Sequence, residues 1–186
     1  MRVISGKLKG RSIKFIKNHI TRPIKDSVKE NIFNILKHSN EIKVQVENSS
    51  VLDLYSGVGS FGIECISRGA KEVTFVEENK HSFRILSDNL KNLSILSQSN
   101  IINYKIDDFQ KIKKRKEYDI FFFDPPFVDN QFFKHLVFFK EEKFYNDNHI
   151  VIVHREKKSK DNLNKYLKPI KTKVYGRSMI FFGMFN

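Results

Sequence analysis

The sequence is poor in the residues that several kinds of site require. It has one cysteine, Cys65, among 186 residues, which excludes an intramolecular disulfide and a cysteine-based zinc site. We expect Cys65 to pack inside a helix, and no group of His, Asp and Glu has metal-ligand spacing. No apolar run approaches the roughly 20 residues that a membrane-spanning helix needs, and the start lacks the apolar segment of a signal peptide. These absences predict a cytoplasmic protein with a single domain, residues 1–186.

Acidic residues are absent from the first 22 positions, although the chain as a whole has 21 of them. The net charge is +13, which points to a polyanionic partner. The basic residues of this segment are Arg2, Lys7, Lys9, Arg11, Lys14, Lys17 and Arg22. Such a cluster predicts an arm that contacts RNA phosphates. The alternative is a solvated basic surface, because the whole chain is rich in Lys, Asn, Ile and Phe.

Residues 51–62 read as a buried strand that runs into a glycine-rich turn and then a helix. The glycines at 57, 59 and 62 satisfy the dinucleotide fingerprint, which alone is a weak signal. Asp53 lies inside the strand, where a pyrophosphate gains nothing from a nearby negative charge. A cofactor with a cationic amino-acid end, such as S-adenosylmethionine, would benefit from it. Glu77 ends the next strand and can accept both ribose hydroxyls of either cofactor.

A second motif, Asp124-Pro125-Pro126-Phe127, follows the apolar strand 119–123. Each proline fixes φ and removes a backbone donor, so carbonyls around this turn can face a ligand. A carboxylate and a free carbonyl can accept both hydrogens of one planar amine, while Phe127 stacks on the ring that carries the amine. The motif therefore favours alkylation of an exocyclic base nitrogen over an ordinary proline turn.

Asp107 and Asp108 follow the predicted strand 101–106, the third along the chain. An acceptor at this place can meet an adenine amino group. Acidic groups thus end successive strands, a pattern that fits a methyltransferase better than a dehydrogenase. The cofactor contacts that we predict are Asp53, Tyr55, Gly57, Gly59, Glu77, Asp107 and Asp108.

Strands and helices alternate along the chain, which predicts an α/β fold with a mostly parallel sheet and helices on both faces. The expected strands lie near 51–55, 72–77, 101–106, 119–124 and 149–154, with a strand pair within 174–182. The expected helices lie near 60–68, 80–92, 129–139 and 160–167. Before them, residues 2–17 suggest a short hairpin or an extended arm, and a helix runs from Asp26, a plausible N-cap, to about Lys37.

The chain resembles the bacterial small-subunit (16S) ribosomal RNA guanine-N2 methyltransferases, the RsmD-like family. Residues 1–11 resemble the family's N-terminal arm, and Arg22-Pro23-x-x-Asp26-x-Val28-Lys29-Glu30-x-x-Phe33-Asn34 matches a second hallmark outside the generic core. The resemblance covers nearly the whole length. The family usually carries Arg where Ser27 and Lys29 stand, which affects the RNA contact and not the fold.

The resemblance implies a class I, Rossmann-like methyltransferase fold with S-adenosylmethionine as methyl donor. Its substrate would be a guanine in a hairpin loop of small-subunit ribosomal RNA, methylated at N2. At the level of sequence the form of the substrate stays open between naked RNA, an assembly intermediate and the finished subunit, and nothing suggests more than a monomer. The catalytic residues implied are Asp124, Pro125, Pro126 and Phe127. The RNA contacts expected are Arg2, Lys7, Lys9, Arg11, Arg22, Lys29 and Arg177. Residues 1–45 would form an RNA-contacting extension and 50–186 the catalytic core.

Three other functions stay open at the level of sequence. The same chemistry could act on another planar amine, such as adenine N6 or a protein glutamine. The chain could instead be a non-catalytic RNA-binding factor of ribosome assembly, or a nicotinamide-dependent enzyme. For His81, His135 and His154 we expect surface or capping roles rather than catalysis.

Overall fold

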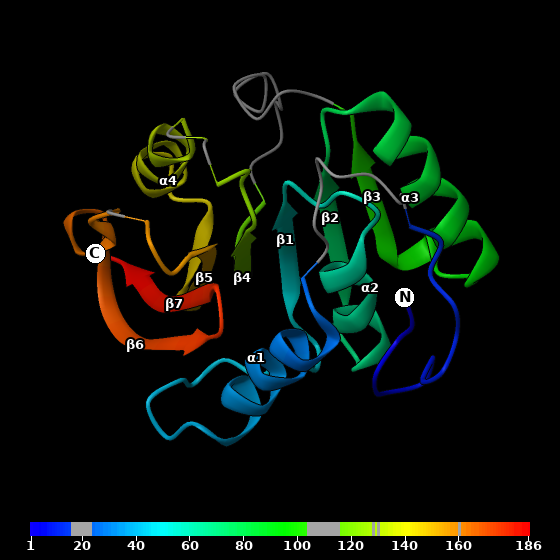
Figure 1. Ribbon diagram of the computed structural model, residues 1–186, viewed down its shortest axis with the longest axis horizontal. Helices are drawn as coiled ribbons and strands as arrows, with labels where there is room; N and C mark the ends of the chain where they lie inside the picture. The colour runs from blue at the N-terminus through cyan, green and yellow to red at the C-terminus, as the bar shows by residue number, and fades with distance from the viewer. Residues whose placement is uncertain (16–23, 104–115, 128, 130, 160) are drawn as a thin grey trace.

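A seven-stranded sheet forms the centre of the protein in the order β3-β2-β1-β4-β5-β7-β6, as a computed structural model shows (Figure 1). The structure describes residues 1–15, 24–103, 116–127, 129, 131–159 and 161–186. The strands are β1 Ser50–Leu54, β2 Glu72–Val76, β3 Ser99–Ile102, β4 Tyr118–Phe123, β5 Tyr145–Glu156, β6 Leu167–Tyr175 and β7 Ser178–Phe185. The helices are α1 Asp26–His38, α2 Ser60–Ser67, α3 Lys80–Asn92 and α4 Phe132–Glu141. Strands β1 to β5 pair in parallel, whereas β7 is antiparallel to β5 and β6.

One face of the sheet is covered by the N-terminal hairpin, α1, α2 and α3, which lie together in Figure 1. The alternation of strand side chains explains this face, because residues such as Val51, Ile120 and Ile152 all point to it. Cys65 is fully buried there within α2, as the sequence predicted, and burial raises the pKa of its thiol.

The opposite face is covered by α4 and the short turn that precedes β6. Its core is aromatic: Phe121 and Phe123 of β4 meet Phe139 of α4 with their rings nearly perpendicular. Edge-to-face pairs of this kind add to the stabilisation that burial of apolar area gives. Side chains packed on both faces therefore hold the sheet in place. The carboxyl ends of the parallel strands β1 to β5 lie along one edge of it.

The N-terminal hairpin that the sequence predicted is present. Arg2 and Ser12 form an antiparallel bridge, and Val3 exchanges two backbone hydrogen bonds with the returning segment, of 3.0 and 2.9 Å. The buried side chains of Val3 and Ile13 join the same hydrophobic cluster as α1 and α2. The hairpin is thus packed on the core rather than free of it.

The predicted helix at 160–167 is wrong. The chain forms only a single 3-10 turn at Leu163–Lys165, and β6 begins at Leu167. The spacing of Leu163 and Leu167 imitates a helical stripe, but both side chains pack on the α4 face of the sheet. Pro169 cannot continue a helix, and it is tolerated in an edge strand such as β6.

Several boundaries also differ from the sequence prediction, among them the start of α1 and the end of β3. Lys25 occupies the N-cap position of α1, and Asp26 is the first helical residue. The third strand ends at Ile102, and residues 104–106 lie outside the part of the chain that the structure describes. No helix among the described residues is long and apolar enough to cross a membrane.

Candidate active site

The turn after β1 combines strained backbone with open space. Tyr55 and Gly57 have φ values of 60° and 56°, and Gly59, the N-cap of α2, has a φ of 86°. A Cβ on Gly57 would meet no atom within 4 Å, whereas one on Gly59 would lie 2.5 Å from the Cδ1 atom of Leu86. Gly59 is therefore required for packing against α3, and Gly57 leaves room beside the turn for a ligand.

Asp53 lies beneath this turn rather than on its surface. Its side chain belongs to a residue only 1% exposed, and Oδ2 accepts a hydrogen bond of 3.0 Å from the Gly62 amide. Burial raises the pKa of Asp53 well above its usual value, and the charges of Asp124 and Glu77 raise it further against the opposing effect of the Gly62 bond. Asp53 thus fixes the first turn of α2 against β1.

Glu77 follows β2 and closes the same site from the other side. Its Oε2 accepts from the Gly57 amide and its Oε1 from the Asn79 amide, each at 2.7 Å. Each carboxylate oxygen has a second lone pair, so Glu77 can still accept two ribose hydroxyls. Burial raises the pKa of its carboxyl group. Asp107 and Asp108, the other predicted cofactor contacts, lie outside the described residues.

Tyr55 connects the turn to the other face of the sheet. Its hydroxyl lies 2.7 Å from Nδ1 of His135, on α4. His135 is 7% exposed, so the surface role expected for it is wrong, and it holds a tyrosine instead. His135 therefore holds the hydroxyl of Tyr55, the tyrosine that we expected to contact the cofactor.

The Asp124-Pro125-Pro126-Phe127 turn lies at the carboxyl end of β4, where the sequence placed it. The side chain of Asp124 is 24% exposed, and Phe127 is 39% exposed. Among the described residues, the Pro126 carbonyl has donors in the Asp129 amide and Arg155, whereas no hydrogen bond to the Pro125 carbonyl or to Asp124 Oδ2 occurs. The turn can therefore present one carboxylate oxygen, one carbonyl and one ring to a ligand.

His154, which follows the apolar run of β5 and lies two residues before the strand ends, is a site residue that sequence reasoning missed. Its Nδ1 lies 2.8 Å from Asp124 Oδ1, and its Nε2 lies 2.9 Å from the Ser178 hydroxyl. The parallel register of β4 and β5 pairs Phe123 with Val153, so the next residue of each strand lies beside the other. The sequence held a signal, since both residues directly follow apolar strands. The capping or surface role expected for His154 is wrong.

Arg155 was missed as well, and it holds the proline turn from the opposite face of β5. Its guanidinium donates to the carbonyls of Pro126, at 2.9 Å, and Phe127, at 3.0 Å. It also pairs with Asp161 and lies 4.6 Å above the ring of Phe132. Arg155 is 1% exposed, so its charge is enclosed entirely by partners. The planar fork of arginine suits two neighbouring carbonyls in a way that lysine does not.

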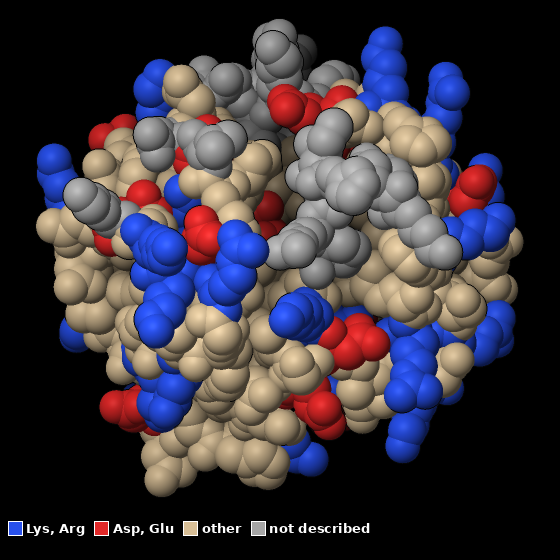
Figure 2. Space-filling view, in the orientation of Figure 1, with Lys and Arg blue, Asp and Glu red and all other residues tan. Residues whose placement is uncertain are grey.

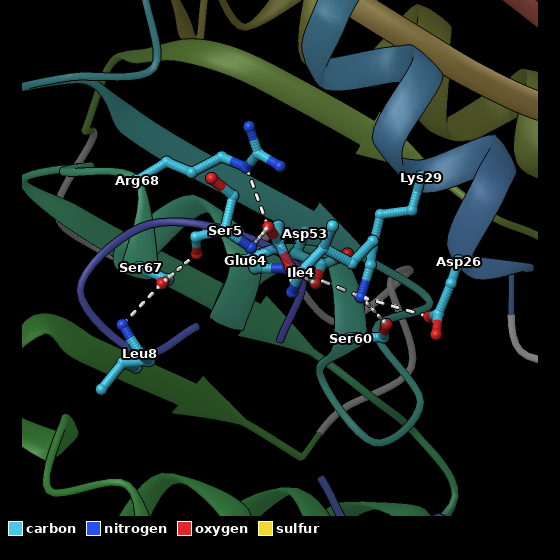
Figure 3. A network of polar contacts seen from close by, with 11 residues as sticks. Ile4, Ser5, Leu8, Asp26, Lys29, Asp53, Ser60, Glu64, Ser67 and Arg68 are labelled. Atoms are coloured by element: carbon cyan, nitrogen blue, oxygen red, sulfur yellow. Dashed lines mark hydrogen bonds and ion pairs between the residues drawn. The ribbon is translucent and has the colours of Figure 1, made fainter. Parts of the chain in front are cut away.

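The predicted RNA contact at Lys29 is wrong. Lys29 is 0% exposed, and its Nζ lies 3.0 Å from the Ser60 hydroxyl and 3.6 Å from Glu64 Oε2 (Figure 3). Burial lowers the pKa of this amine, although the charge of Glu64 opposes the shift. The sequence contained the signal, because positions 29, 32, 33 and 36 form one helical stripe and the last three are apolar. Lys29 joins α1 to α2 and is closed to RNA.

The other predicted RNA contacts that the structure describes are exposed. Arg2, Lys7, Lys9 and Arg11 lie on the hairpin, and Arg177 lies in the turn between β6 and β7. Arg177 pairs with Glu156 at 2.7 Å, and Arg22 lies outside the described residues. Figure 2 shows lysine and arginine side chains over the hairpin and also over β6 and β7, on opposite sides of this face.

Comparison with known proteins identifies the family. The family model described as "Conserved hypothetical protein 95" matches residues 1–184. The ribosomal RNA small subunit methyltransferase D of Buchnera aphidicola is 34% identical over 84% of this chain and 78% of its own length. The Haemophilus influenzae protein of the same name is 34% identical over 84% of this chain and 79% of its own length.

Solved structures agree with the fold. A putative methylase from Haemophilus influenzae superposes with a TM-score of 0.76 at 30% identity, covering 97% of this chain and 96% of that one. A putative methyltransferase from Escherichia coli, at 22% identity, has a TM-score of 0.81 over 100% of this chain and 99% of its own, which supports the fold alone. The fold is therefore that of the class I methyltransferases, and the chain belongs to the family described as conserved hypothetical protein 95, the RsmD-like family.

Proposed function

We propose that this protein transfers a methyl group from S-adenosylmethionine to N2 of a guanine in small-subunit ribosomal RNA. The observation that carries the proposal is the Asp124 carboxylate beside the Pro125 carbonyl, with the ring of Phe127 exposed next to them. The relatives named as small-subunit ribosomal RNA methyltransferases support the substrate class.

The residues around the β1 turn fit the proposed cofactor. Gly57 borders open space, and both oxygens of Glu77 keep a lone pair for ribose hydroxyls. A cationic amino-acid end nearby would favour the ionised form of Asp53, against the effect of burial on its pKa. The Tyr55 hydroxyl is held by His135. When bound, S-adenosylmethionine supplies an electrophilic methyl group on a sulfonium. Asp107 and Asp108 complete the proposed set of cofactor contacts.

The proline turn would prepare the substrate amine. The lone pair of guanine N2 is conjugated into the ring, so the amine is a poor nucleophile until its geometry changes. Asp124 Oδ2 and the Pro125 carbonyl would accept its two hydrogens and favour a pyramidal nitrogen. Phe127 would stack on the base, a contact worth about 1–3 kcal/mol. The N2 proton would pass to Asp124 as the new nitrogen–carbon bond forms.

The base must leave its stack to reach this turn, at a cost of a few kcal/mol that is least for a loop nucleotide. We assign the phosphate contacts to arginine and lysine residues of the predicted extension, 1–45, and to the arginine in the turn after β6. The residues are Arg2, Lys7, Lys9, Arg11, Arg22 and Arg177. We also propose that the protein acts as a monomer, on the small subunit or one of its assembly intermediates.

The test is methyl transfer from labelled S-adenosylmethionine to naked small-subunit RNA, assembly intermediates and complete unmodified subunits. Nucleoside mass spectrometry of the product should find N2-methylguanosine, and the preferred substrate identifies the stage of assembly. Detection of labelled N6-methyladenosine or of a labelled ribosomal protein would show that the substrate amine is not N2 of guanine. Cofactor binding in an isothermal titration without methylation of any of these substrates would contradict the proposed reaction.

A further inference from the structure

We propose that His154 is a positioning residue that holds the carboxylate of Asp124, and that Ser178 selects the tautomer of its ring that can do so. The inference deepens the proposed function and rests on it, because Asp124 is the residue assigned there to the substrate amine. Nothing in the family resemblance assigned a role to either His154 or Ser178.

The surroundings of His154 leave its ring little freedom. The side chain is 5% exposed, and Phe127 meets the ring edge-on with centroids 5.7 Å apart. Its Nδ1 lies 2.8 Å from Asp124 Oδ1 on one side, and its Nε2 lies 2.9 Å from Ser178 Oγ on the other. His154 and Ser178 belong to β5 and β7, and Asp124 directly follows β4, so the sheet sets the separation of the three polar groups.

The chemistry of the partners decides which ring nitrogen carries hydrogen. An ionised carboxylate can only accept hydrogen bonds, so Nδ1 must be the donor to Asp124. In a neutral imidazole Nε2 is then an acceptor, and the Ser178 hydroxyl must donate to it. Ser178 reaches Nε2 because it lies two residues before Ile180, which pairs with His154 across the antiparallel strands β5 and β7. Ser178 therefore stabilises the Nδ1–H tautomer.

The hydrogen bond from His154 determines which oxygen of Asp124 is left for the substrate. The terminal torsion of an aspartate is broad and nearly two-fold, so a carboxylate without partners samples many orientations. With Oδ1 bonded to His154, Oδ2 is left to accept from the amine. As the N2 lone pair bonds to the methyl carbon and the carbon–sulfur bond breaks, the N2 proton passes to Oδ2, and the Nδ1–H of His154 stays on the ring. His154 acts through Asp124 and does not touch the reacting atoms.

Three substitutions of His154 separate this role from a general need for packing. His154→Leu removes the donor, and we expect kcat to fall about 10- to 100-fold, the range of an acceptor displaced by about 1 Å. His154→Asn places an amide donor near the position of Nδ1 and should recover most of the loss, whereas His154→Gln places its amide near Nε2 and should not. KM for RNA and the cofactor Kd should stay unchanged in all three.

The matched control is the exposed residue His38 in the last turn of α1, whose change to Leu should leave kcat as in the wild type. Thermal unfolding of each variant shows whether it is folded. If folded His154→Leu keeps wild-type kcat, or if Gln rescues as well as Asn does, the positioning role is refuted while the methylation itself stands.

A second measurement does not depend on activity. Nitrogen-15 NMR of histidine-labelled protein reports the tautomer of each ring, and the signal missing from His154→Leu identifies His154. We expect an Nδ1–H ring that changes in Asp124→Ala and in Ser178→Ala. An Nε2–H ring would overturn the inference even if RNA is methylated. If no substrate is methylated, the proposed reaction fails by itself, and the tautomer still decides whether His154 holds Asp124.

Discussion

Two carboxylates, Glu64 and Asp124, each have a basic side chain beside them, but the protein uses them differently. Glu64 is 0% exposed and has four partners: the amides of Ile4, at 2.8 Å, and Ser5, at 2.9 Å, and the side chains of Arg68 and Lys29 (Figure 3). The side chain of Asp124 is 24% exposed, and only its Oδ1 has a partner among the described residues, His154.

The difference follows from where each carboxylate lies. Glu64 is inside α2, between the hairpin and α1, so donors reach it from three elements and satisfy its charge. Asp124 lies where the chain leaves the sheet, and the packing around it ends there. A buried carboxylate whose acceptor sites are filled by the protein holds elements together. One with an unfilled oxygen at an open edge is available to a substrate.

The largest effect should come from Asp124→Ala, which removes the partly exposed carboxylate of the two. We expect kcat to fall about 10²- to 10⁴-fold, the range for loss of a group that accepts a proton in the transition state. The cofactor Kd and the free energy of unfolding should change little, because Asp124 is partly exposed. Steady-state methylation of unmodified RNA measures kcat, and near-normal turnover with cofactor bound would remove Asp124 from the mechanism.

Glu64→Leu removes the buried carboxylate, and it should lower the stability without changing the rate of methyl transfer. Removing one partner of a buried ion pair costs about 3–5 kcal/mol, here because Lys29 and two hairpin amides lose their acceptor. Urea unfolding gives the free energy, and kcat of the protein that remains folded should be near that of the wild type. The isosteric Glu64→Gln, which keeps an acceptor, should lose less stability. Equal stability of Glu64→Leu and wild type would show that the cluster is not structural.

Arg155→Lys should lower both the stability and kcat, because Arg155 is buried like Glu64 but holds the proline turn that contains Asp124. Loss of a hydrogen bond from the guanidinium to the carbonyl of Pro126 or Phe127 should cost about 1.5–3 kcal/mol of unfolding free energy. The turn should also loosen, so kcat should fall in the same variant. Arg84→Lys, at an exposed arginine of α3, is the control for both measurements. A variant that loses stability with unchanged kcat would place Arg155 with the purely structural residues.

The smallest effect that we expect is the pH-dependent part of the stability difference between the wild type and Lys29→Met. Burial lowers the pKa of Lys29 below 10.5, so between the lowered pKa and 10.5 the unfolded chain binds more protons than the folded one. The stability of the wild type relative to Lys29→Met should therefore rise with pH through that window, by up to about 1.4 kcal/mol per unit of lowering. Denaturant unfolding of both proteins from pH 7 to pH 10.5 measures the difference, in which the exposed lysines cancel. A flat difference would contradict the effect of burial.

Much of the fold could be predicted from local sequence. The apolar strands, the glycine turn and the spacing of the helices gave a parallel sheet, and the order of elements brought Asp53, Glu77 and Asp124 to one edge. The failures have one cause, which is that a residue's neighbours in space were not known. Leu163 and Leu167 are spaced as in a helix, yet they flank a turn and a strand because both pack on the same face of the sheet.

Charge was the property that sequence reasoning interpreted least well. Lys29 was grouped with the exposed basic residues, but Glu64, thirty-five positions away, makes its burial tolerable. His154 resembled any polar residue at the end of a strand until the register of β4 and β5 placed it against Asp124.

The sequence by itself determined the class of fold, the glycine-rich turn after β1 and the candidate catalytic motif, because strand alternation, glycine conformation and proline geometry are local properties. Only the tertiary structure decided which charged groups are buried and which oxygen of Asp124 is left open. Those outcomes depend on strand register and on pairs such as Lys29 with Glu64. Burying a charge requires partners from distant segments, and the linear sequence does not show which segments meet.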